Sequence, residues 1–141
     1  MRPLSILFIC IGNTCRSPMA EAIARALGGD RVHASSAGLA ATGRVAASTL
    51  EALATLGHPS DGLASKGLDE VPLEGLDVVV SLIGPAGLDW LPRGLAAQRV
   101  AWAIPDPYGS DVATYLAVGR AIEERVRGLL GELLAGEPAA G

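Results

Sequence analysis

Aromatic residues are scarce in this 141-residue chain, at 4% of the sequence, and Phe8 is its one phenylalanine. The chain therefore has little material for the stacked aromatic platforms that bind single-stranded nucleic acids. Positive charge is not in excess either, because 11 Lys and Arg stand against 15 Asp and Glu, a net charge of −4. This balance gives no overall field that attracts nucleic acid or an anionic membrane. We expect neither as a partner, so any bound anion must be held by local groups.

Long apolar runs are also missing. The longest, from Leu4 to Ile11, is interrupted by Ser5 and is far shorter than the ~20 residues that span a bilayer. Polar residues follow it where a signal peptide would need small residues for cleavage. Two cysteines in a chain of this length do not make a disulfide framework. These features predict a cytoplasmic protein.

Hydrophobic residues, by contrast, make up half of the sequence and charged residues only 18%. That is enough apolar material for one buried core in a domain of ordinary size. Proline and glycine are spread along the chain, and no stretch has the composition of a linker. We expect one catalytic domain over residues 1–135, followed by a frayed tail over residues 136–141.

The hydrophobic pattern predicts strands that alternate with helices. Strands are expected over residues 4–9, 31–36, 76–82 and 99–104, and helices over residues 19–27, 46–56 and 111–134, with a short helix after Pro85. This alternation predicts an α/β fold with a parallel sheet and right-handed crossovers. In such sheets ligands bind beyond the carboxyl ends of the strands. Reactive residues are therefore expected just after Ile9 and just after Ile104.

The first expected helix has clear boundary signals. Ser17 is placed to cap its N-terminus, with Pro18 at the first helical position and Glu21 in the first turn. Gly28 and Gly29 are expected to end it.

The segment that leads into this helix suits an oxyanion. It reads Cys10-Ile11-Gly12-Asn13-Thr14-Cys15-Arg16-Ser17. A loop at a helix N-terminus can turn several backbone N–H groups inward around an anion. Gly12 and Asn13 tolerate the positive φ angles that such a loop needs. The Arg16 guanidinium can hold two oxygens of a tetrahedral oxyanion.

Cys10 stands at the mouth of the loop, where its sulfur would face the central atom of a bound oxyanion. Arg16, the helix N-terminus and the Ser17 hydroxyl all favour the thiolate form of this cysteine. The sequence thus predicts a nucleophile that is ionised at neutral pH without a histidine partner. Neither His33 nor His58 lies in the loop.

Other interpretations of the loop are weaker. A zinc site would draw on four residues whose spacing suits no compact finger: Cys10, Cys15, His33 and His58. A nucleotide-binding loop needs Lys before Ser or Thr, whereas here Arg16 precedes Ser17. Cys15 is open to two roles, as a structural thiol or as a redox partner of Cys10.

Asp106 marks the second expected position of chemistry. It lies between Pro105 and Pro107, after the fourth expected strand. An acid held above the loop could protonate a leaving-group oxygen and then activate water. Most Asp-Pro pairs only start turns, but the place of this one at a strand end favours a catalytic role. We expect Tyr108 and Tyr115 to pack near the same cleft.

The segment from Cys10 to Glu21 resembles the signature of the low-molecular-weight protein-tyrosine phosphatases and of the arsenate reductases that share their fold. The resemblance spans most of the chain, with further matches at Ser36-Ala37-Gly38, Asp77-Val78-Val79-Val80 and Asp106-Pro107-Tyr108-Gly109. It implies a single domain with four parallel strands in the order 2-1-3-4 and helices on both faces.

The resemblance also implies roles for particular residues. Cys10 would be the nucleophile, Arg16 the oxyanion clamp and Asp106 the general acid. A hydrogen-bond network would shape the loop through Asn13, Ser17 and Ser36. The remaining loop positions would surround the oxyanion: Ile11, Gly12, Thr14 and Cys15. No metal or cofactor is implied.

The resemblance leaves two reactions open. In the phosphatases the cysteine attacks phosphorus and forms a phosphocysteine, which water hydrolyses. In the reductases, two further cysteines on the segment after the third strand release arsenite as a disulfide forms. The corresponding segment here, Ser81–Pro92, contains no cysteine. A reductase would therefore need Cys15 or an external thiol such as glutathione or mycothiol.

Smaller features point both ways. The phosphatases usually place an aromatic wall after the second strand, but Leu39–Arg44 has no aromatic residue, and Val100–Asp106 is similar to the reductases. Thr14 is similar to the residue at this position in the bacterial members that act on phosphoarginine.

We expect a cysteine phosphatase acting on phosphorylated protein side chains or small phosphomonoesters, with an arsenate reductase as the alternative. A catalytically idle oxyanion-binding module is a third hypothesis, against which the complete set Cys10, Arg16 and Asp106 argues.

Overall fold

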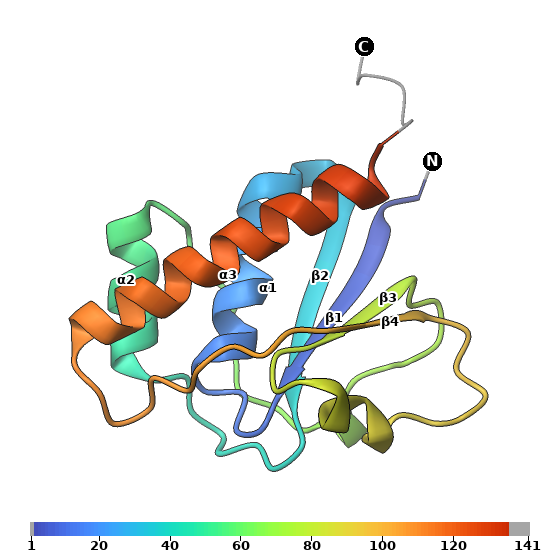
Figure 1. Cartoon of the computed structure of the whole chain (residues 1–141), viewed down its shortest axis with the longest axis horizontal. Helices are drawn as coiled ribbons and strands as arrows, with labels where there is room; N and C mark the ends of the chain where they lie inside the picture. The colour runs from blue at the N-terminus through green and yellow to red at the C-terminus, as the bar shows by residue number, and fades with distance from the viewer. Residues whose placement is uncertain (1, 136–141) are drawn as a thin grey trace.

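The computed structural model describes residues 2–135, so the tail expected over residues 136–141 lies outside the described part. Four strands form one sheet: β1 (Leu4–Cys10), β2 (Val32–Gly38), β3 (Val78–Ser81) and β4 (Gln98–Ala101). All neighbouring strands are parallel, in the order β2-β1-β3-β4, as the resemblance implied. The fold is a single-domain α/β fold, and the carboxyl ends of its strands meet at one edge (Figure 1).

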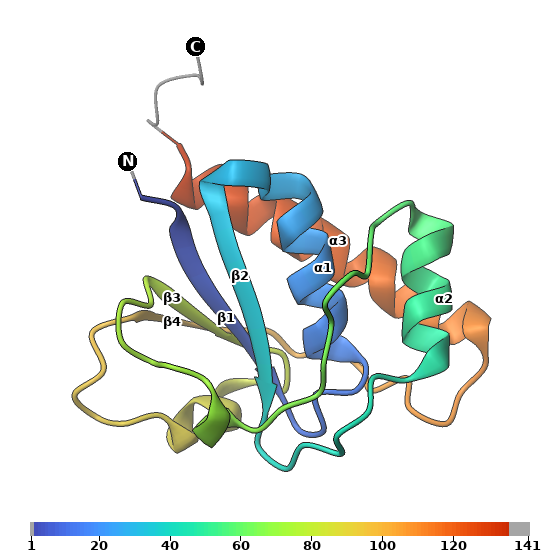
Figure 2. The ribbon, with the colours of Figure 1, turned by 180° about the vertical axis from the view of Figure 1, so that it is seen from behind.

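Three α-helices lie on the same side of the sheet in both views (Figures 1 and 2). They are α1 (Arg16–Gly28), α2 (Ala47–Leu56) and α3 (Val112–Leu133). Their apolar side chains form the larger core with alternate residues of the strands, among them Phe8 and Val80. Ile23 of α1 and Ile122 of α3 are fully buried in it. The second face holds Leu7, Ile9 and Val79 in a smaller core.

This second face explains why the first strand is apolar at nearly every position, since it is buried on both sides. Short 3₁₀ helices and loops cover this second face. Helices therefore lie on both faces of the sheet, as expected, but only the first face carries α-helices. Two 3₁₀ helices lie on this face, η2 (Leu68–Glu70) and η3 (Pro85–Trp90), whereas η1 (Gly29–Arg31) links α1 to β2. Leu68 of η2 and Leu88 of η3 pack against this smaller core.

The start of α1 differs from the expectation. The helix begins at Arg16 with Cys15 as its N-cap, and no side chain caps it, so the prediction of Ser17 as the cap is wrong. The loop after β1 is so tight that the helix starts two residues earlier than expected. Pro18 is therefore its third residue, where it is tolerated because that N–H has no helical partner. Glu21 falls in the second turn and is buried, not in the first turn.

The other boundaries lie close to the predicted ones. Gly57 ends α2 with a φ of 82°, a conformation that glycine adopts without strain. Asp111 caps α3, since its side chain accepts a hydrogen bond from the Thr114 backbone N–H at 2.9 Å. β4 stops at Ala101, three residues before the expected end. Within residues 2–135 no helix is both long and apolar enough to cross a membrane.

Candidate active site

The loop after β1 turns sharply at Asn13. Its φ is 49°, and no other non-glycine residue among residues 2–135 has a positive φ. The prediction that Asn13 adopts such a conformation is confirmed, whereas Gly12 does not need it. Gly12 matters for its size, because a Cβ there would lie 3.2 Å from the Thr14 hydroxyl oxygen. Gly38, which sequence reasoning left without a role, lets β2 approach the loop, since a Cβ would lie only 2.6 Å from the Ile11 carbonyl oxygen.

Cys10 is the last residue of β1 and is 2% exposed. Its sulfur lies 2.9 Å from the Ser17 hydroxyl oxygen. Asn13 contacts the same hydroxyl group from its other side. The Lys66 backbone N–H donates to Asn13 Oδ1 at 2.9 Å, so the amide nitrogen Nδ2 is the end that donates to Ser17, at 2.7 Å. Because the Ser17 oxygen accepts this bond, its own proton is free for the Cys10 sulfur.

The same amide nitrogen also donates to the Ser36 hydroxyl, at 3.0 Å. Ser36 in turn donates to Glu21 Oε1 at 2.5 Å. Glu21 is 1% exposed and forms ion pairs with Arg25 and, at 3.8 Å, with Lys66. The structure thus brings together the predicted network of Asn13, Ser17 and Ser36, and adds a buried carboxylate at its end. Sequence reasoning missed this role of Glu21, although Glu21 ends the signature.

Arg16, the first residue of α1, and Asp106, in the loop after β4, meet across the site. Arg16 donates to the Ile104 carbonyl oxygen at 2.9 Å, which fixes the guanidinium against the segment after β4. Its second nitrogen lies 3.7 Å from Asp106 Oδ2. The Asp106 side chain is 53% exposed, and its other oxygen accepts the Tyr108 backbone N–H at 3.0 Å. The loop after β4 therefore presents a carboxylate to solvent, directly above the arginine.

These residues line one pocket of about 190 Å³. Its lining residues are Cys10, Ile11, Gly12, Thr14, Cys15, Arg16, Ala40, Thr42, Asp106 and Tyr108. The volume is well below the ~300–1,000 Å³ of pockets for drug-sized ligands, so the pocket suits a small group such as a phosphoryl group. All ten predicted site residues thus lie together: seven line the pocket, and Asn13, Ser17 and Ser36 form the network behind it.

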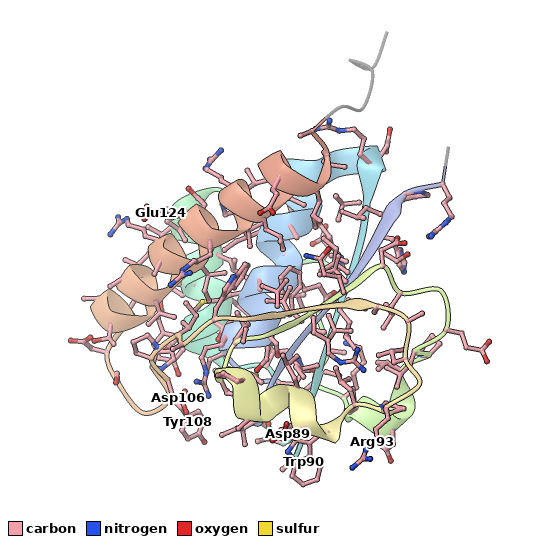
Figure 3. All side chains as sticks on the ribbon, turned by 45° about the vertical axis from the view of Figure 1, so that its right-hand side comes forward. Asp89, Trp90, Arg93, Asp106, Tyr108 and Glu124 are labelled. Atoms are coloured by element: carbon pink, nitrogen blue, oxygen red, sulfur yellow. The ribbon has the colours of Figure 1, made fainter. Side chains whose placement is uncertain are left out.

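The pocket wall is polar on one side. The hydroxyl groups of Thr14 and Thr42 are 2.6 Å apart, and the Thr49 hydroxyl donates to the Thr14 carbonyl oxygen at 3.0 Å. Ala40 and Thr42 come from the segment Leu39–Arg44, in which the resemblance implied an aromatic wall, and neither carries a ring. The aromatic ring at this pocket is that of Tyr108 instead, which is 67% exposed (Figure 3).

Cys15 lies at the base of the pocket, and its thiol donates to the Tyr115 hydroxyl at 3.4 Å. Burial raises the pKa of Cys15, and it also raises the pKa of Tyr115 well above the ordinary range. Both groups are therefore protonated at neutral pH. The prediction that Tyr115 packs near the cleft is confirmed. Cys10 and Cys15 are both free thiols.

The candidate zinc ligands do not form a cluster. Among residues 2–135, no group of three or more His, Cys, Asp or Glu side chains could hold a metal ion. His58 contacts Glu123 of α3 instead, with its ring nitrogen 2.5 Å from the carboxylate.

The fold and the site together are those of an α/β enzyme that acts on oxyanions. The chain belongs to the low molecular weight phosphotyrosine protein phosphatase family, whose pattern it matches over residues 5–138. It is 30% identical to the glutaredoxin arsenate reductase of Synechocystis over 130 residues, which is 91% of this chain and 97% of that protein.

Solved structures of both kinds of enzyme share this fold. The arsenate reductase of Archaeoglobus fulgidus is 36% identical, with a TM-score of 0.78 over 89% of this chain and 98% of its own. The YwlE arginine phosphatase, solved as a mutant with a phosphorylated active-site serine, is 25% identical, with a TM-score of 0.82 over 95% and 98% of the two chains. The family thus contains phosphatases and arsenate reductases, and this chain is similar to both.

Proposed function

We propose that this protein is a cysteine-dependent phosphatase that works through a phosphocysteine intermediate and needs no metal ion. The observation that carries the proposal is the joint lining of one small pocket by Cys10, Arg16 and Asp106. Phosphoryl transfer needs a nucleophile, a clamp for the phosphoryl oxygens and a proton donor for the leaving group. These three residues supply one each.

In the first step the phosphoryl group is held by Arg16 and by the backbone N–H groups at the start of α1. The Cys10 thiolate forms a bond to phosphorus as the bond to the substrate oxygen or nitrogen breaks. Asp106 gives its proton to the leaving group. In the second step Asp106, now a carboxylate, takes a proton from water as the water oxygen attacks phosphorus. The Cys10 thiolate leaves, stabilised by the Ser17 hydroxyl at 2.9 Å.

The substrates are phosphorylated protein side chains, phosphotyrosine or phosphoarginine, or small phosphomonoesters. The Thr14–Thr42 hydroxyl pair supports phosphoarginine, because its oxygens can accept hydrogen bonds from N–H groups beside the phosphorus. The similarity to the YwlE arginine phosphatase agrees with this. We place the protein in the cytoplasm, where a catalytic thiol stays reduced.

Arsenate reduction is the second candidate, favoured by relatives named arsenate reductase. Ser81–Pro92 offers no cysteine to relay the disulfide. An external thiol of the glutathione or mycothiol type would therefore attack the Cys10 sulfur of the arsenylated enzyme, releasing arsenite and leaving a mixed disulfide. A second thiol molecule would then free Cys10, so that one arsenate oxidises two thiols to one disulfide.

Steady-state hydrolysis of p-nitrophenyl phosphate, with a chelator present, tests the proposal. We expect many turnovers per enzyme and none from Cys10→Ser, with phosphate binding retained in that variant. Absence of turnover in the unmodified protein, together with glutathione-dependent reduction of arsenate, would replace the phosphatase by the reductase. Unchanged activity in Cys10→Ser would remove Cys10 from either mechanism.

A further inference from the structure

The exposed aromatic residues gather at the edge of the sheet where the catalytic pocket opens. The chain has five aromatic residues, and Phe8, Trp102 and Tyr115 are buried. The other two, Trp90 and Tyr108, are 66% and 67% exposed. Figure 3 shows both projecting from the same edge of the molecule. Trp and Tyr are the residues that dominate binding energy in protein interfaces, so their shared position indicates a binding surface.

Beside the catalytic pocket lies a second pocket, of about 440 Å³. Its lining residues are Leu39, Leu68, Asp69, Leu73, Trp90 and Pro92. Most of this wall is apolar, and Asp69 is the charged member. Asp69 forms no ion pair within residues 2–135. The second pocket is thus fitted to an apolar group with positive charge nearby.

The two pockets share a wall. Leu39 lines the second pocket and its neighbour Ala40 lines the catalytic pocket. Both residues are tied to the reactive loop: the Leu39 N–H donates to the Cys10 carbonyl at 3.0 Å and the Ala40 N–H to the Ile11 carbonyl at 2.8 Å. The spacing between the pockets is therefore fixed by backbone hydrogen bonds.

The backbone that carries Trp90 is also held in place. It ends η3, and this short helix is anchored to β3 because the Ser81 hydroxyl donates to the Gly84 carbonyl at 2.7 Å. Gly87 packs so closely on Ser81 that a Cβ would lie 2.2 Å from the hydroxyl oxygen. An exposed ring on a rigid support binds with little loss of conformational entropy.

We propose that the second pocket binds an apolar side chain of a polypeptide substrate whose phosphorylated residue occupies the catalytic pocket. The inference rests on the proposed phosphatase function and selects proteins as its substrates over small phosphomonoesters. A chain leaving the catalytic pocket passes the shared wall at Leu39 and Ala40 and reaches Trp90. A second copy of this protein on the same surface would close the catalytic pocket, so it fits the surface less well.

Peptide kinetics test the inference. Each peptide carries one phosphotyrosine or phosphoarginine. A single Leu is placed in turn at each position before and after the phosphorylated residue, and the other positions are Ser. A second set of peptides has a Lys next to the Leu. We expect kcat/KM to be about tenfold higher at one or two Leu positions, through KM, because one anchored apolar side chain contributes at this scale. Trp90→Ala should abolish that preference and leave p-nitrophenyl phosphate hydrolysis within twofold.

Leu50→Ala is the matched control, since Leu50 is 39% exposed but lies on α2, outside both pockets. It should retain both the peptide preference and the hydrolysis of p-nitrophenyl phosphate. In Cys10→Ser, the preferred peptide should shift the fluorescence of Trp90, and the shift should vanish when Trp90 is also replaced by Ala.

Different failures have different meanings. Lack of p-nitrophenyl phosphate hydrolysis in the unmodified protein would overturn the phosphatase function itself. Normal hydrolysis of that ester without any Leu preference, or without any peptide hydrolysis, would overturn the surface alone. A concentration-dependent dimer that Trp90→Ala dissociates, with unchanged peptide kinetics, would make the surface a contact between copies. A last outcome concerns arsenate reduction with a thiol protein as the reductant. If Trp90→Ala loses that activity while its peptide kinetics stay unchanged, the surface is a site for the thiol protein.

Discussion

The Ser17 hydroxyl oxygen lies 2.9 Å from the Cys10 sulfur and accepts a hydrogen bond from the Asn13 amide on its other side, which leaves its O–H free to donate to a Cys10 thiolate. Ser17 can play this part because it is the second residue of α1 and not its cap. The Cys10 sulfur carries negative charge before it attacks phosphorus and again when it leaves. The Ser17 hydroxyl is its hydrogen-bond donor in both steps.

Ser17→Ala removes that donor. A hydrogen bond to a charged group contributes about 1.5–3 kcal/mol, so we expect kcat for p-nitrophenyl phosphate to fall about 10–100-fold. Rapid-quench measurement of the phosphocysteine should show slower breakdown of the intermediate. Ser35→Ala is the control, because Ser35 neighbours Ser36 but lies outside the network, and it should behave like the unmodified protein. A wild-type kcat in Ser17→Ala would mean that the hydroxyl does not assist the sulfur.

Asp106→Asn removes the proton donor at the pocket. General acid catalysis contributes about 10²–10⁴-fold, so we expect a loss of that size in kcat. The loss should be larger for alkyl phosphates than for p-nitrophenyl phosphate, since an alkoxide needs the proton more. Asp111→Asn serves as the control, because Asp111 caps α3 and does not line the pocket. Equal losses for both leaving groups would exclude Asp106 as the acid.

Peroxide should inactivate the enzyme reversibly. Peroxide converts the Cys10 thiolate to a sulfenic acid, and the Cys15 thiol then displaces water to form a Cys10–Cys15 disulfide. Both thiols line the same pocket, and Cys15 is held protonated because burial raises its pKa. Dithiothreitol should restore activity in the unmodified protein but not in Cys15→Ala, in which Cys10 should reach the sulfinic acid. Mass spectrometry that finds sulfinic Cys10 with Cys15 still present would contradict the protective role.

The hydrogen-bonded pair of His58, which follows α2, and Glu123 of α3 makes stability depend on pH. The hydrogen bond from His58 holds the pKa of Glu123 below its ordinary value of 4.5, and Arg127 adds to the effect. Because the folded pKa is the lower one, the pair stabilises the fold fully above that ordinary value. Its contribution is lost as the pH falls through the folded pKa, where the native carboxylate is finally protonated.

Glu123→Gln should therefore lower the free energy of unfolding by about 0.5–1 kcal/mol at pH 7, a value for a partly exposed pair. The difference from the unmodified protein should shrink toward pH 3. Urea denaturation at several pH values measures it. Glu124→Gln is the matched control, since Glu124 is exposed on the same helix (Figure 3). A constant difference between pH 7 and pH 3 would rule out the carboxylate charge as its cause.

Much of the fold and of the site could be predicted from local sequence. β1 is apolar throughout because both its faces are buried, and glycines mark the ends of α1 and α2. The residues of the reactive loop are consecutive, so their meeting needed no knowledge of distant contacts. Asp106 could be placed because parallel strands end at one edge.

What could not be predicted depends on contacts between distant segments. Glu21 looked like a helix-start signal, and only the positions of Ser36 and Lys66 make it a buried support of the loop. Ser17 is a residue type that often caps helices, but because the loop turns tightly at Asn13, the helix already begins at Arg16. A large apolar residue such as Trp90 is expected in a hydrophobic core. It is exposed because of the way η3 lies on the sheet.

Lys66 joins the reactive loop from a position more than fifty residues later in the chain. Its backbone N–H orients the Asn13 amide, and its carbonyl accepts the Gly38 N–H at 2.9 Å. The first forty residues contain the nucleophile and the clamp, yet they cannot orient the loop without this later segment. Catalytic competence is therefore a property of the completed fold. During refolding, or during synthesis of the chain, activity should arise as one late event, after the sheet and α1 have formed.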